Sequence, residues 1–446
     1  MKKLVTFASD LRVHALLCCS ATVLLTACGG GVADADNGPQ PAQAALLLDS
    51  AARQSDTGDA AVPADSATNP ATTAVTGGQP TTAQSGDAPR LLASVVAVAA
   101  ASPSIYHLYV ATTGSDSNPG SMSSPFKTIQ KAASLAKPST TVHVAAGTYF
   151  GNVTSSVNGT ATARIRYVSD TKWGAKVIDS GTEFMWTNRG NYTDIVGFDI
   201  SGPGRVGILN LAGYTLMQGN YVHNLTVSGG CGGGGGAGIN NGDYTKSDND
   251  VIGNVVHDIG VPGKCNTVQG IYSANLRGRV INNIVYRASS WGINLWHAAN
   301  QVTIANNTVF QNGAGSMGGG IFFGTGDSGG TVMSNTKVLN NIVYNNAAKG
   351  IYAYCTGVSG CWGSGNAVIN NLVYGNGTSI TIPQGTSATG TIAADPQFVN
   401  YQANGTGNYR LKSTSPAINK GTASSAPTYD IDFYARPRGV AHDIGA

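Results

Sequence analysis

A two-part phrase that recurs six times constrains the fold of this chain more than any other feature of its sequence. One part is a Gly-Ile pair, and the other is an Asn that precedes a β-branched, strand-like segment. The pairs start at Gly207, Gly238, Gly270, Gly292, Gly320 and Gly350, and the Asn residues are Asn220, Asn254, Asn283, Asn307, Asn341 and Asn371. Successive copies lie 22 to 34 residues apart. A strand-like unit repeated at this period is typical of a solenoid, in which each repeat stacks on its neighbours.

Length and composition are compatible with one long solenoid domain. The chain has 446 residues, including 60 Gly, and only 11% of its residues are charged. Solenoids grow in one dimension and escape the size limit of globular domains. Many Gly and few charges suit tight turns and stacked uncharged side chains. The net charge of +3 is spread without a basic stripe, so we expect no nucleic-acid partner.

The N-terminus has the features of an export signal. A basic start precedes an apolar run at 15–27, which is too short to span a bilayer. The segment Leu25-Thr26-Ala27-Cys28 resembles the bacterial lipobox, which implies removal of residues 1–27 and acylation of Cys28. Gly29 in place of Asp then implies sorting to the outer membrane, with this lipid as the membrane contact. Ordinary signal cleavage beside an incidental Cys is the alternative.

Composition separates a tether from the folded domain. Residues 28–104 are rich in Ala, Thr, Asp, Pro, Gly and Ser and lack a sustained period, so we predict a flexible linker. The domain is expected to cover 105–446. Four Cys remain after export and lipidation, an even number in an oxidising compartment, which predicts two disulfides.

The start of the domain predicts a strand and then a cap. A strand is expected at 106–110, and Phe126, Ile129 and Ala133 follow at helical spacing in the segment 125–133. Pro125 suits the first turn of a short amphipathic helix. An open solenoid end exposes apolar core and unpaired strand edges, so we expect this helix to cap it.

The segment 106–446 resembles the right-handed parallel β-helix proteins of the pectate-lyase-like superfamily. The resemblance rests on the opening motifs at 109–116, 125–129 and 146–149, and on an ending that includes Asp395-Pro396, Arg436-Pro437 and Asp443-Ile444-Gly445-Ala446. It implies an all-β fold, a single-stranded right-handed parallel β-helix with a short N-terminal capping helix. These motifs indicate a fold and do not identify a reaction.

The repeats predict which side chains face outward. Each Ile should point inward and stack in the core, so strand alternation turns the next residue outward. The resulting surface rows are Leu209, Asn240, Tyr272, Asn294, Phe322 and Tyr352, then Leu211, Gly242, Ala274, Trp296, Gly324 and Tyr354. The recurring Asn suits a left-handed turn or a ladder of side-chain amides, which is a structural role.

Loop lengths predict which Cys residues pair. The longest loops before a Gly-Ile pair come before Gly238 and Gly270, and they hold Cys231 and Cys265 at similar offsets. We therefore predict a bond between neighbouring coils. The long loops after Gly320 and Gly350 lie at the opposite edge, where Cys355 and Cys361 are expected to close one loop.

The strand face between these loops predicts a polysaccharide-binding groove. It carries Tyr272, Trp296, Phe322, Tyr352 and Tyr354, and a lightly charged aromatic groove suits stacking on sugar rings. Insertions in repeat proteins also gather on the binding face. The alternative is that each ring only supports a loop.

The resemblance to polysaccharide lyases implies a basic residue that abstracts a proton beside a uronic carboxylate. We predict Lys264, Asp243 and His297 as catalytic residues, with Arg277 binding the carboxylate. His257 shares the repeat position of Tyr286 and Phe310, which favours a packed role.

Calcium is the predicted cofactor. Asp248 and Asp250, in what reads as an acidic loop, could supply hard oxygen ligands to Ca²⁺. A solvated acidic loop without metal is the alternative.

The sequence lacks the paired Asp residues of inverting hydrolases and any Ser-His-Asp, zinc or nucleotide motif. The leading hypothesis is an envelope-anchored, monomeric polysaccharide lyase. A non-catalytic glycan-binding or adhesion protein is the second, and a structural envelope protein is the third.

Overall fold

A computed structural model describes residues 104–178, 181, 183–227, 231, 235–325, 331–355, 360–383 and 386–446. The predicted signal peptide, Cys28 and the predicted tether up to residue 103 lie outside these residues. Within the part of the chain that is described, no helix is long and apolar enough to cross a membrane.

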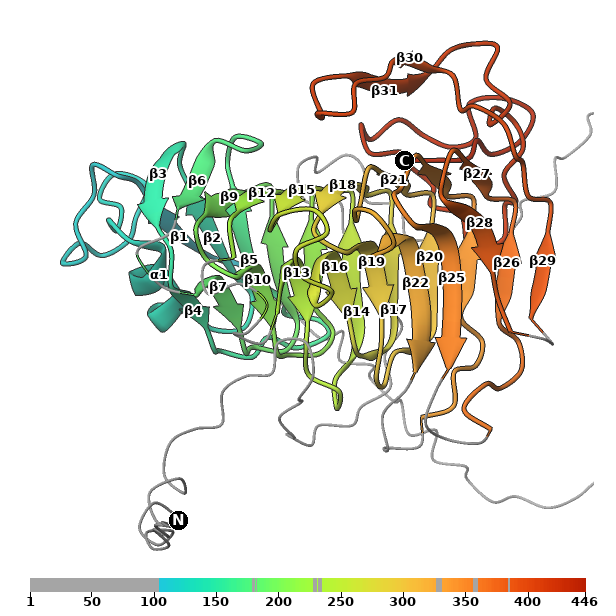
Figure 1. Cartoon of the computed structure of the whole chain (residues 1–446). Coiled ribbons are helices and arrows are strands. Elements are labelled where there is room, and N and C mark those ends of the chain that lie inside the picture. Colours follow the sequence, from blue (N-terminus) through green and yellow to red (C-terminus); the bar gives the residue numbers. More distant parts are fainter. Residues whose placement is uncertain are drawn as a thin grey trace, which may run out of the picture.

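Three parallel sheets run the length of the domain, and each coil visits them in the same order. Sheet 1 contains β1 (Tyr106–Val110), β2 (Thr140–Val144), β5 (Ile165–Ser169), β8 (Thr193–Val196), β11 (Leu216–Gln218), β14 (Ser247–Ile252), β17 (Leu276–Ile281), β20 (Asn300–Ala305), β23 (Lys337–Leu339), β26 (Ala367–Ile369) and β29 (Ser387–Thr389). Sheet 2 contains β3 (Gly147–Phe150), β6 (Ala175–Ile178), β9 (Asp199–Gly202), β12 (Tyr221–Leu225), β15 (Val255–Ile259), β18 (Ile284–Ala288), β21 (Thr308–Phe310), β24 (Ile342–Tyr344) and β27 (Leu372–Tyr374). Sheet 3 contains β4 (Val153–Ser155), β7 (Phe184–Asn188), β10 (Val206–Asn210), β13 (Gly236–Asn241), β16 (Val268–Ser273), β19 (Trp291–Leu295), β22 (Gly319–Thr325), β25 (Lys349–Cys355) and β28 (Thr378–Thr381). This is the predicted right-handed parallel β-helix, and Figure 1 shows its sheets stacked along one axis.

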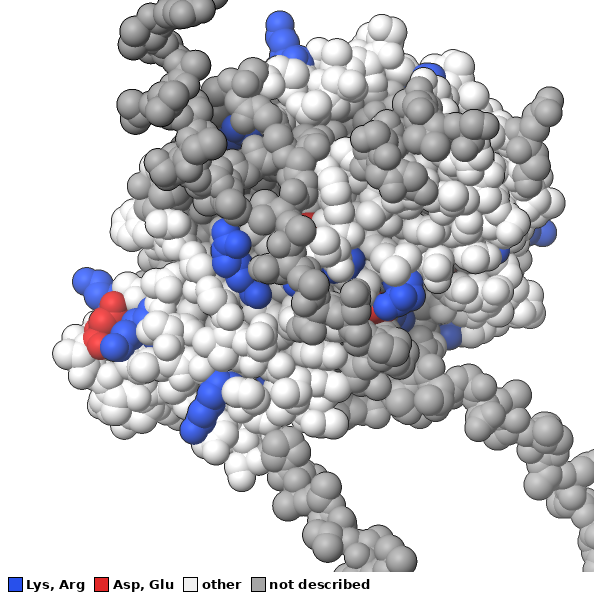
Figure 2. All heavy atoms as spheres, turned by 90° about the horizontal axis from the view of Figure 1, so that it is seen from below, with Lys and Arg blue, Asp and Glu red and all other residues white. Residues whose placement is uncertain are grey.

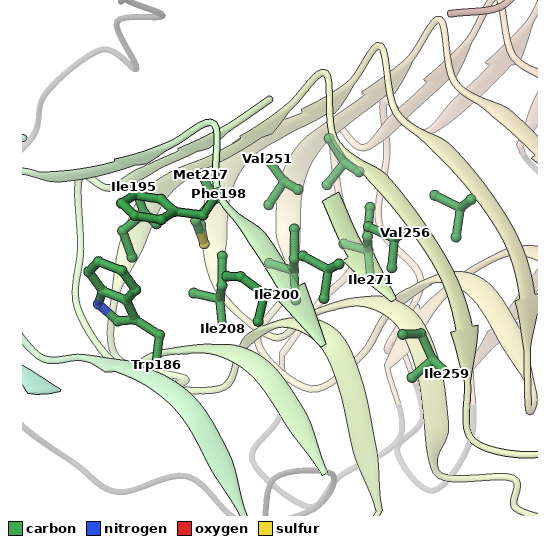
Figure 3. Close-up of a cluster of buried hydrophobic side chains, with 14 of the residues drawn as sticks. Trp186, Ile195, Phe198, Ile200, Ile208, Met217, Val251, Val256, Ile259 and Ile271 are labelled. Carbon is green, nitrogen blue, oxygen red and sulfur yellow. The ribbon is translucent and has the colours of Figure 1, made fainter. Parts of the chain in front are cut away.

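The core confirms the predicted inward direction of the Ile residues. In sheet 3, Ile239 pairs with Ile208 on one side and with Ile271 on the other, and all three are fully buried. Figure 3 shows Ile208 and Ile271 inside the coils with Ile200 and Val256 from sheet 2. Stacking of like residues fills the narrow interior at every coil.

The two halves of the repeat depend on each other. A Cβ on Gly292 would lie 2.5 Å from a methyl group of Val309, the residue two places after a repeat Asn. The other five repeat Gly residues have the same kind of contact with a Val of sheet 2. Only Gly lets sheet 3 approach sheet 2 this closely, which explains why Gly precedes each Ile.

The predicted Asn ladder is confirmed at the turn between sheets 1 and 2. Each repeat Asn bonds to the next one along the axis; for example, the side-chain amide of Asn283 donates to Oδ1 of Asn307 at 2.9 Å. A second ladder of Asn312, Asn346 and Asn376 occupies the turn between sheets 2 and 3. Such ladders satisfy buried main-chain groups at corners where the sheets cannot.

The N-terminal cap is present but shorter than predicted. Helix α1 spans Ile129–Leu135, and the side chain of Thr128 accepts a hydrogen bond from the main-chain N of Lys131 as its N-cap. The prediction that Pro125 lies in the first turn was wrong, because the main chain of Phe126 pairs with β1 and its N–H donates to the carbonyl of Tyr109. Ile129, Ala132 and Ala133 are buried and join the core of the first coils.

A C-terminal segment, 395–446, covers the outer face of sheet 2. Its hairpin of β30 (Phe398–Asn400) and β31 (Asn408–Leu411) lies above β21 and β27 in Figure 1. Phe398 and Ile444 pack with outward residues of sheet 2 such as Phe310. Main-chain carbonyls of the C-terminal segment accept side-chain hydrogen bonds from the Asn that precedes each of four repeat Asn residues: Asn282, Asn306, Asn340 and Asn370.

Both predicted disulfides are confirmed. Cys231 bonds to Cys265 across neighbouring coils, and Cys355 bonds to Cys361 within one loop.

Candidate functional site on the outer face of sheet 3

The predicted outward row is in register along sheet 3. Tyr272 pairs with Asn294, Asn294 with Phe322, and Phe322 with Tyr352. Its exposure differs from the prediction. Tyr272 is 2% exposed and Phe322 8%, whereas Tyr354 in the second row is 42% exposed. The accessible part of the face therefore lies in the later coils.

The turn after β13 accounts for the burial in the earlier coils. Tyr244 of this turn and Trp296 pack against a small cluster that contains Tyr272 and Ala274. Tyr244 also stacks on His297, with ring centroids 4.3 Å apart. This turn, between sheets 3 and 1, thus covers part of the strand face.

The later coils present a strip of adjacent rings, which we call the aromatic strip: Trp291, Trp296, Phe322, Tyr352 and Tyr354. Ring centroids lie 5.4 Å apart for Trp296 and Phe322, 5.7 Å for Phe322 and Tyr352, and 5.9 Å for Tyr352 and Tyr354. Trp291 is parallel to Tyr352 within 5° at 5.9 Å. The sequence prediction omitted Trp291, because it lies two residues before the inward Ile293 and strict alternation would place it inward.

Two features shape the aromatic strip. Nζ of Lys349 lies 3.6 Å from the ring centroid of Tyr352, which places a positive charge on the strip. A Cβ on Gly324 would lie 3.1 Å from the Trp296 ring, so the absence of a side chain there lets Trp296 lean across the next strand. The accessible rings are those of Trp296, Tyr352 and Tyr354, and Lys349 lies beside Tyr352.

The three predicted catalytic residues do not converge. Asp243 is buried in the turn after β13, where its Oδ1 accepts hydrogen bonds from the main-chain N and the hydroxyl of Thr245 at 2.9 and 2.7 Å. His297 lies in the turn after β19, at the same edge of sheet 3. Lys264 is exposed in the loop before β16, at the opposite edge. A six-residue strand such as β16 spans about 20 Å, so Lys264 and Asp243 stand on two sides of the face.

The predicted carboxylate ligands of calcium lie elsewhere. Asp248 and Asp250 belong to strand β14 of sheet 1 and not to a loop, so that part of the prediction was wrong. Asp248 accepts two hydrogen bonds from Arg277, at 2.8 and 2.7 Å, and Asp250 bonds to Arg279. Among the described residues, no three His, Cys, Asp or Glu side chains gather as a metal site requires. These residues do not fit a calcium site.

The same pairing removes Arg277 from the face of sheet 3, because it lies on β17 of sheet 1. The sequence contains a signal for this pairing. Asp248 precedes Asn254 by as many residues as Arg277 precedes Asn283, so aligning the repeats on these Asn residues places the two side chains on neighbouring strands. Figure 2, seen from below, shows separate groups of Lys and Arg, one of them beside Asp or Glu, among described residues that are mostly uncharged.

His257 has the packed role that its repeat position predicts. It stacks on Tyr286 with centroids 4.6 Å apart on the outer face of sheet 2. Its Nδ1 lies 2.6 Å from Oδ2 of Asp258 and its Nε2 lies 2.8 Å from the hydroxyl of Tyr221. Burial lowers the pKa of His257, and the hydrogen bond to Asp258 offsets this only in part.

Comparison with solved structures identifies the fold. Pectate lyase Pel9A superposes with a TM-score of 0.55 at 19% identity, covering 77% of this chain and 96% of that one. The A-module of mannuronan C-5 epimerase AlgE4 from Azotobacter vinelandii gives 0.42 at 16% identity, covering 56% and 66%. An alginate lyase from Paenibacillus sp. str. FPU-7 gives 0.37 at 16% identity, covering 59% and 96%. The likeness to pectate lyase Pel9A shows that the chain has the right-handed parallel β-helix fold.

Sequence comparison matches only a short part of the chain. Residues 112–156, which hold the cap and the first coil, match a family described as a protein of unknown function, DUF1565. No curated protein matches the chain.

Proposed function

We propose that the protein binds an acidic polysaccharide along the aromatic strip of sheet 3. The observation that carries this proposal is the row of adjacent rings from Trp296 to Tyr354 with Lys349 stacked against it. Sugar rings present C–H faces that pack on aromatic rings, and an ammonium group can pair with a uronate carboxylate. Coils stacked about 4.8 Å apart make the strip continuous in the direction of the helix axis, which suits a polymer.

Binding is tested by titrating the protein with polygalacturonate, alginate and a neutral glucan. Trp296→Ala and Tyr354→Ala should each weaken binding of the acidic polymers by about tenfold, close to the contribution of one stacked ring. Tyr374→Ala is the matched control, because Tyr374 is 44% exposed but lies on sheet 2. Equal losses in Tyr354→Ala and Tyr374→Ala would contradict the proposal.

Cleavage of the bound polymer by β-elimination is the second candidate. The likeness in fold to pectate lyase Pel9A supports it, together with the stacked pair of Tyr244 and His297 beside the strip. Incubation with each polymer, with and without Ca²⁺, should release product that absorbs as an unsaturated uronate. His297→Gln should abolish the signal while leaving binding intact. Binding without product would favour the non-catalytic function.

Envelope anchoring through Cys28 is proposed on the lipobox-like segment. In bacteria that export the chain, a clickable fatty acid should label the wild type but not Cys28→Ala. Equal labelling of both would disprove it.

A further inference from the structure

A cavity of about 640 Å³ lies on the outer face of sheet 2, away from the aromatic strip. Its floor is the first outward row of four neighbouring strands, and its roof is the C-terminal segment, seen above sheet 2 in Figure 1. The floor residues are Val255, Ile284, Thr308 and Ile342. Volumes of roughly 300–1,000 Å³ are typical of small-molecule sites.

Most positive charges that line the cavity form no ion pair among the described residues. Lys172, Arg410, Arg436 and Arg438 line it together with Asp430, Asp432 and Asp443. Among the described residues the only ion pair in this set joins Arg410 to Asp432, at 2.5 Å. The Asp430 and Asp443 carboxylates accept main-chain N–H groups instead. Lys172 and Arg438 therefore remain available to a ligand, and Arg436 adds its positive charge from within the wall of the cavity.

Arg436 is the most constrained of the three. It donates to the main-chain carbonyls of Asp443 and Gly445 at 3.2 and 2.8 Å, and its Nε is buried with no hydrogen-bond partner among the described residues. Burial lowers the pKa of Arg436, although Asp430 and Asp443 act in the opposite direction. An arginine remains protonated nevertheless, so a buried positive charge faces this region.

The other two cations lie on aromatic rings. Nζ of Lys172 is 4.7 Å from the ring centroid of Trp173, and Cζ of Arg438 is 4.8 Å from that of Tyr434. Trp173 is held in place because its Nε1 donates to the carbonyl of Gly219 at 2.8 Å and its ring stacks on Tyr221. Lys172 and Tyr221 both cover the Trp173 ring, whereas Tyr434 is 54% exposed beside Arg438. A ring next to cations suits a ligand that has both an apolar C–H face and a carboxylate.

We infer that this cavity binds a short oligosaccharide that carries carboxylate groups, such as a uronate trimer. The site is separate from the aromatic strip and does not depend on the function proposed there. A uronate residue places its ring against Tyr434 and its carboxylate against Lys172 or Arg438. The protein would then have a second saccharide site, which lies between sheet 2 and the C-terminal segment.

The test is calorimetric titration of the full chain that carries Trp296→Ala and Tyr354→Ala, in which binding at the aromatic strip is weakened. Trigalacturonate and trimannuronate are the probes, with maltotriose and inorganic phosphate as neutral and simple-anion controls. At least one uronate trimer should bind, more tightly than either control. Adding Lys172→Gln or Arg438→Gln should lower the affinity about tenfold, since each removes one cation from a different wall of the cavity.

Lys412→Gln is the matched control, because Lys412 is an exposed cation of the C-terminal segment that does not line the cavity. It should leave the affinity unchanged, and all variants should keep the unfolding midpoint of their parent. The inference is overturned if neither trimer binds, if maltotriose or phosphate binds equally well, or if Lys412→Gln weakens binding as much as Arg438→Gln. Because Lys172 and Arg438 line the cavity on sheet 2 and lie outside the strip, their effects are independent of the function proposed for sheet 3.

Discussion

Replacing Asn307 with alanine should lower the free energy of unfolding by about 2–6 kcal/mol. Asn307 is fully buried in the middle of the ladder. Its Oδ1 accepts hydrogen bonds from the main-chain N and the side-chain amide of Asn283, both at 2.9 Å. Its own amide donates to the carbonyl of Val280 at 2.8 Å and to Oδ1 of Asn341 at 2.9 Å.

The magnitude follows from the groups that alanine would leave without this partner. The main-chain N–H of Asn283 and the carbonyl of Val280 are two such groups, and each buried unsatisfied group costs about 1–3 kcal/mol. The side-chain amide of Asn283 keeps a bond to the carbonyl of Val251, and Oδ1 of Asn341 keeps the main-chain N of Asn307. These two are therefore left out of the estimate.

Urea unfolding followed by far-UV circular dichroism and tryptophan fluorescence measures the difference by linear extrapolation. Asn158→Ala is the control, because Asn158 is exposed and accepts one hydrogen bond, from the main-chain N of Asn191 at 2.8 Å. It should cost less than about 1 kcal/mol. If Asn307→Ala were no more destabilising than Asn158→Ala, the hydrogen bonds of the ladder would not contribute to the free energy of unfolding.

Three further predictions concern stability. The folded-state pKa of His257 lies below its usual 6.5, so the unfolded chain binds a proton at higher pH than the folded chain does. The contribution of His257 to the free energy of unfolding is therefore full above about pH 6.5 and decreases as the pH falls below it. His257→Gln should reduce this decrease in urea titrations. Replacing Cys231 and Cys265 by Ser opens a loop with a sequence separation of 34 and should cost about 4 kcal/mol by chain entropy, read as a lower unfolding midpoint. Gly292→Ala places a Cβ 2.5 Å from a methyl of Val309 and should cost about 1–3 kcal/mol, part of which Val309→Ala recovers in a double-mutant cycle.

Each of these has an outcome that would contradict it. For His257 the decline should shrink but not vanish, because burial also lowers the pKa of His442; an unchanged slope in His257→Gln would show that the imidazole is not the group responsible. An unfolding midpoint that reducing agent shifts equally in wild type and in the Cys-to-Ser variant would disprove the disulfide contribution. Strict additivity of Gly292→Ala and Val309→Ala would refute the close contact between sheets 3 and 2.

Much of the fold could be predicted because the repeat is local and periodic. Each coil repeats the same geometry, so aligning the chain on its Asn residues places Ile inside, the amide ladder at one corner and Cys231 next to Cys265. The same alignment also places Asp248 beside Arg277 of the next coil, a pairing that the calcium prediction did not consider. Periodicity carries this information because stacked coils turn sequence distance into spatial contact.

The candidate site could be predicted only in part. The order of outward residues follows from alternation, but the burial of Tyr272 depends on Tyr244, a turn residue whose direction no repeat specifies. The separation of Lys264 from Asp243 likewise follows from the width of sheet 3, which places the loops before and after a strand on opposite edges.

The sequence by itself determined the coil, its core and its ladders, since these need only neighbouring repeats in register. Only the tertiary structure decided where side chains remain accessible and where a cavity forms. The C-terminal segment returns over sheet 2 and brings Arg436 near residues that precede it by more than a hundred positions, such as Thr308. Contacts of that range depend on the packing of an irregular segment on the finished β-helix, and no period in the sequence encodes them.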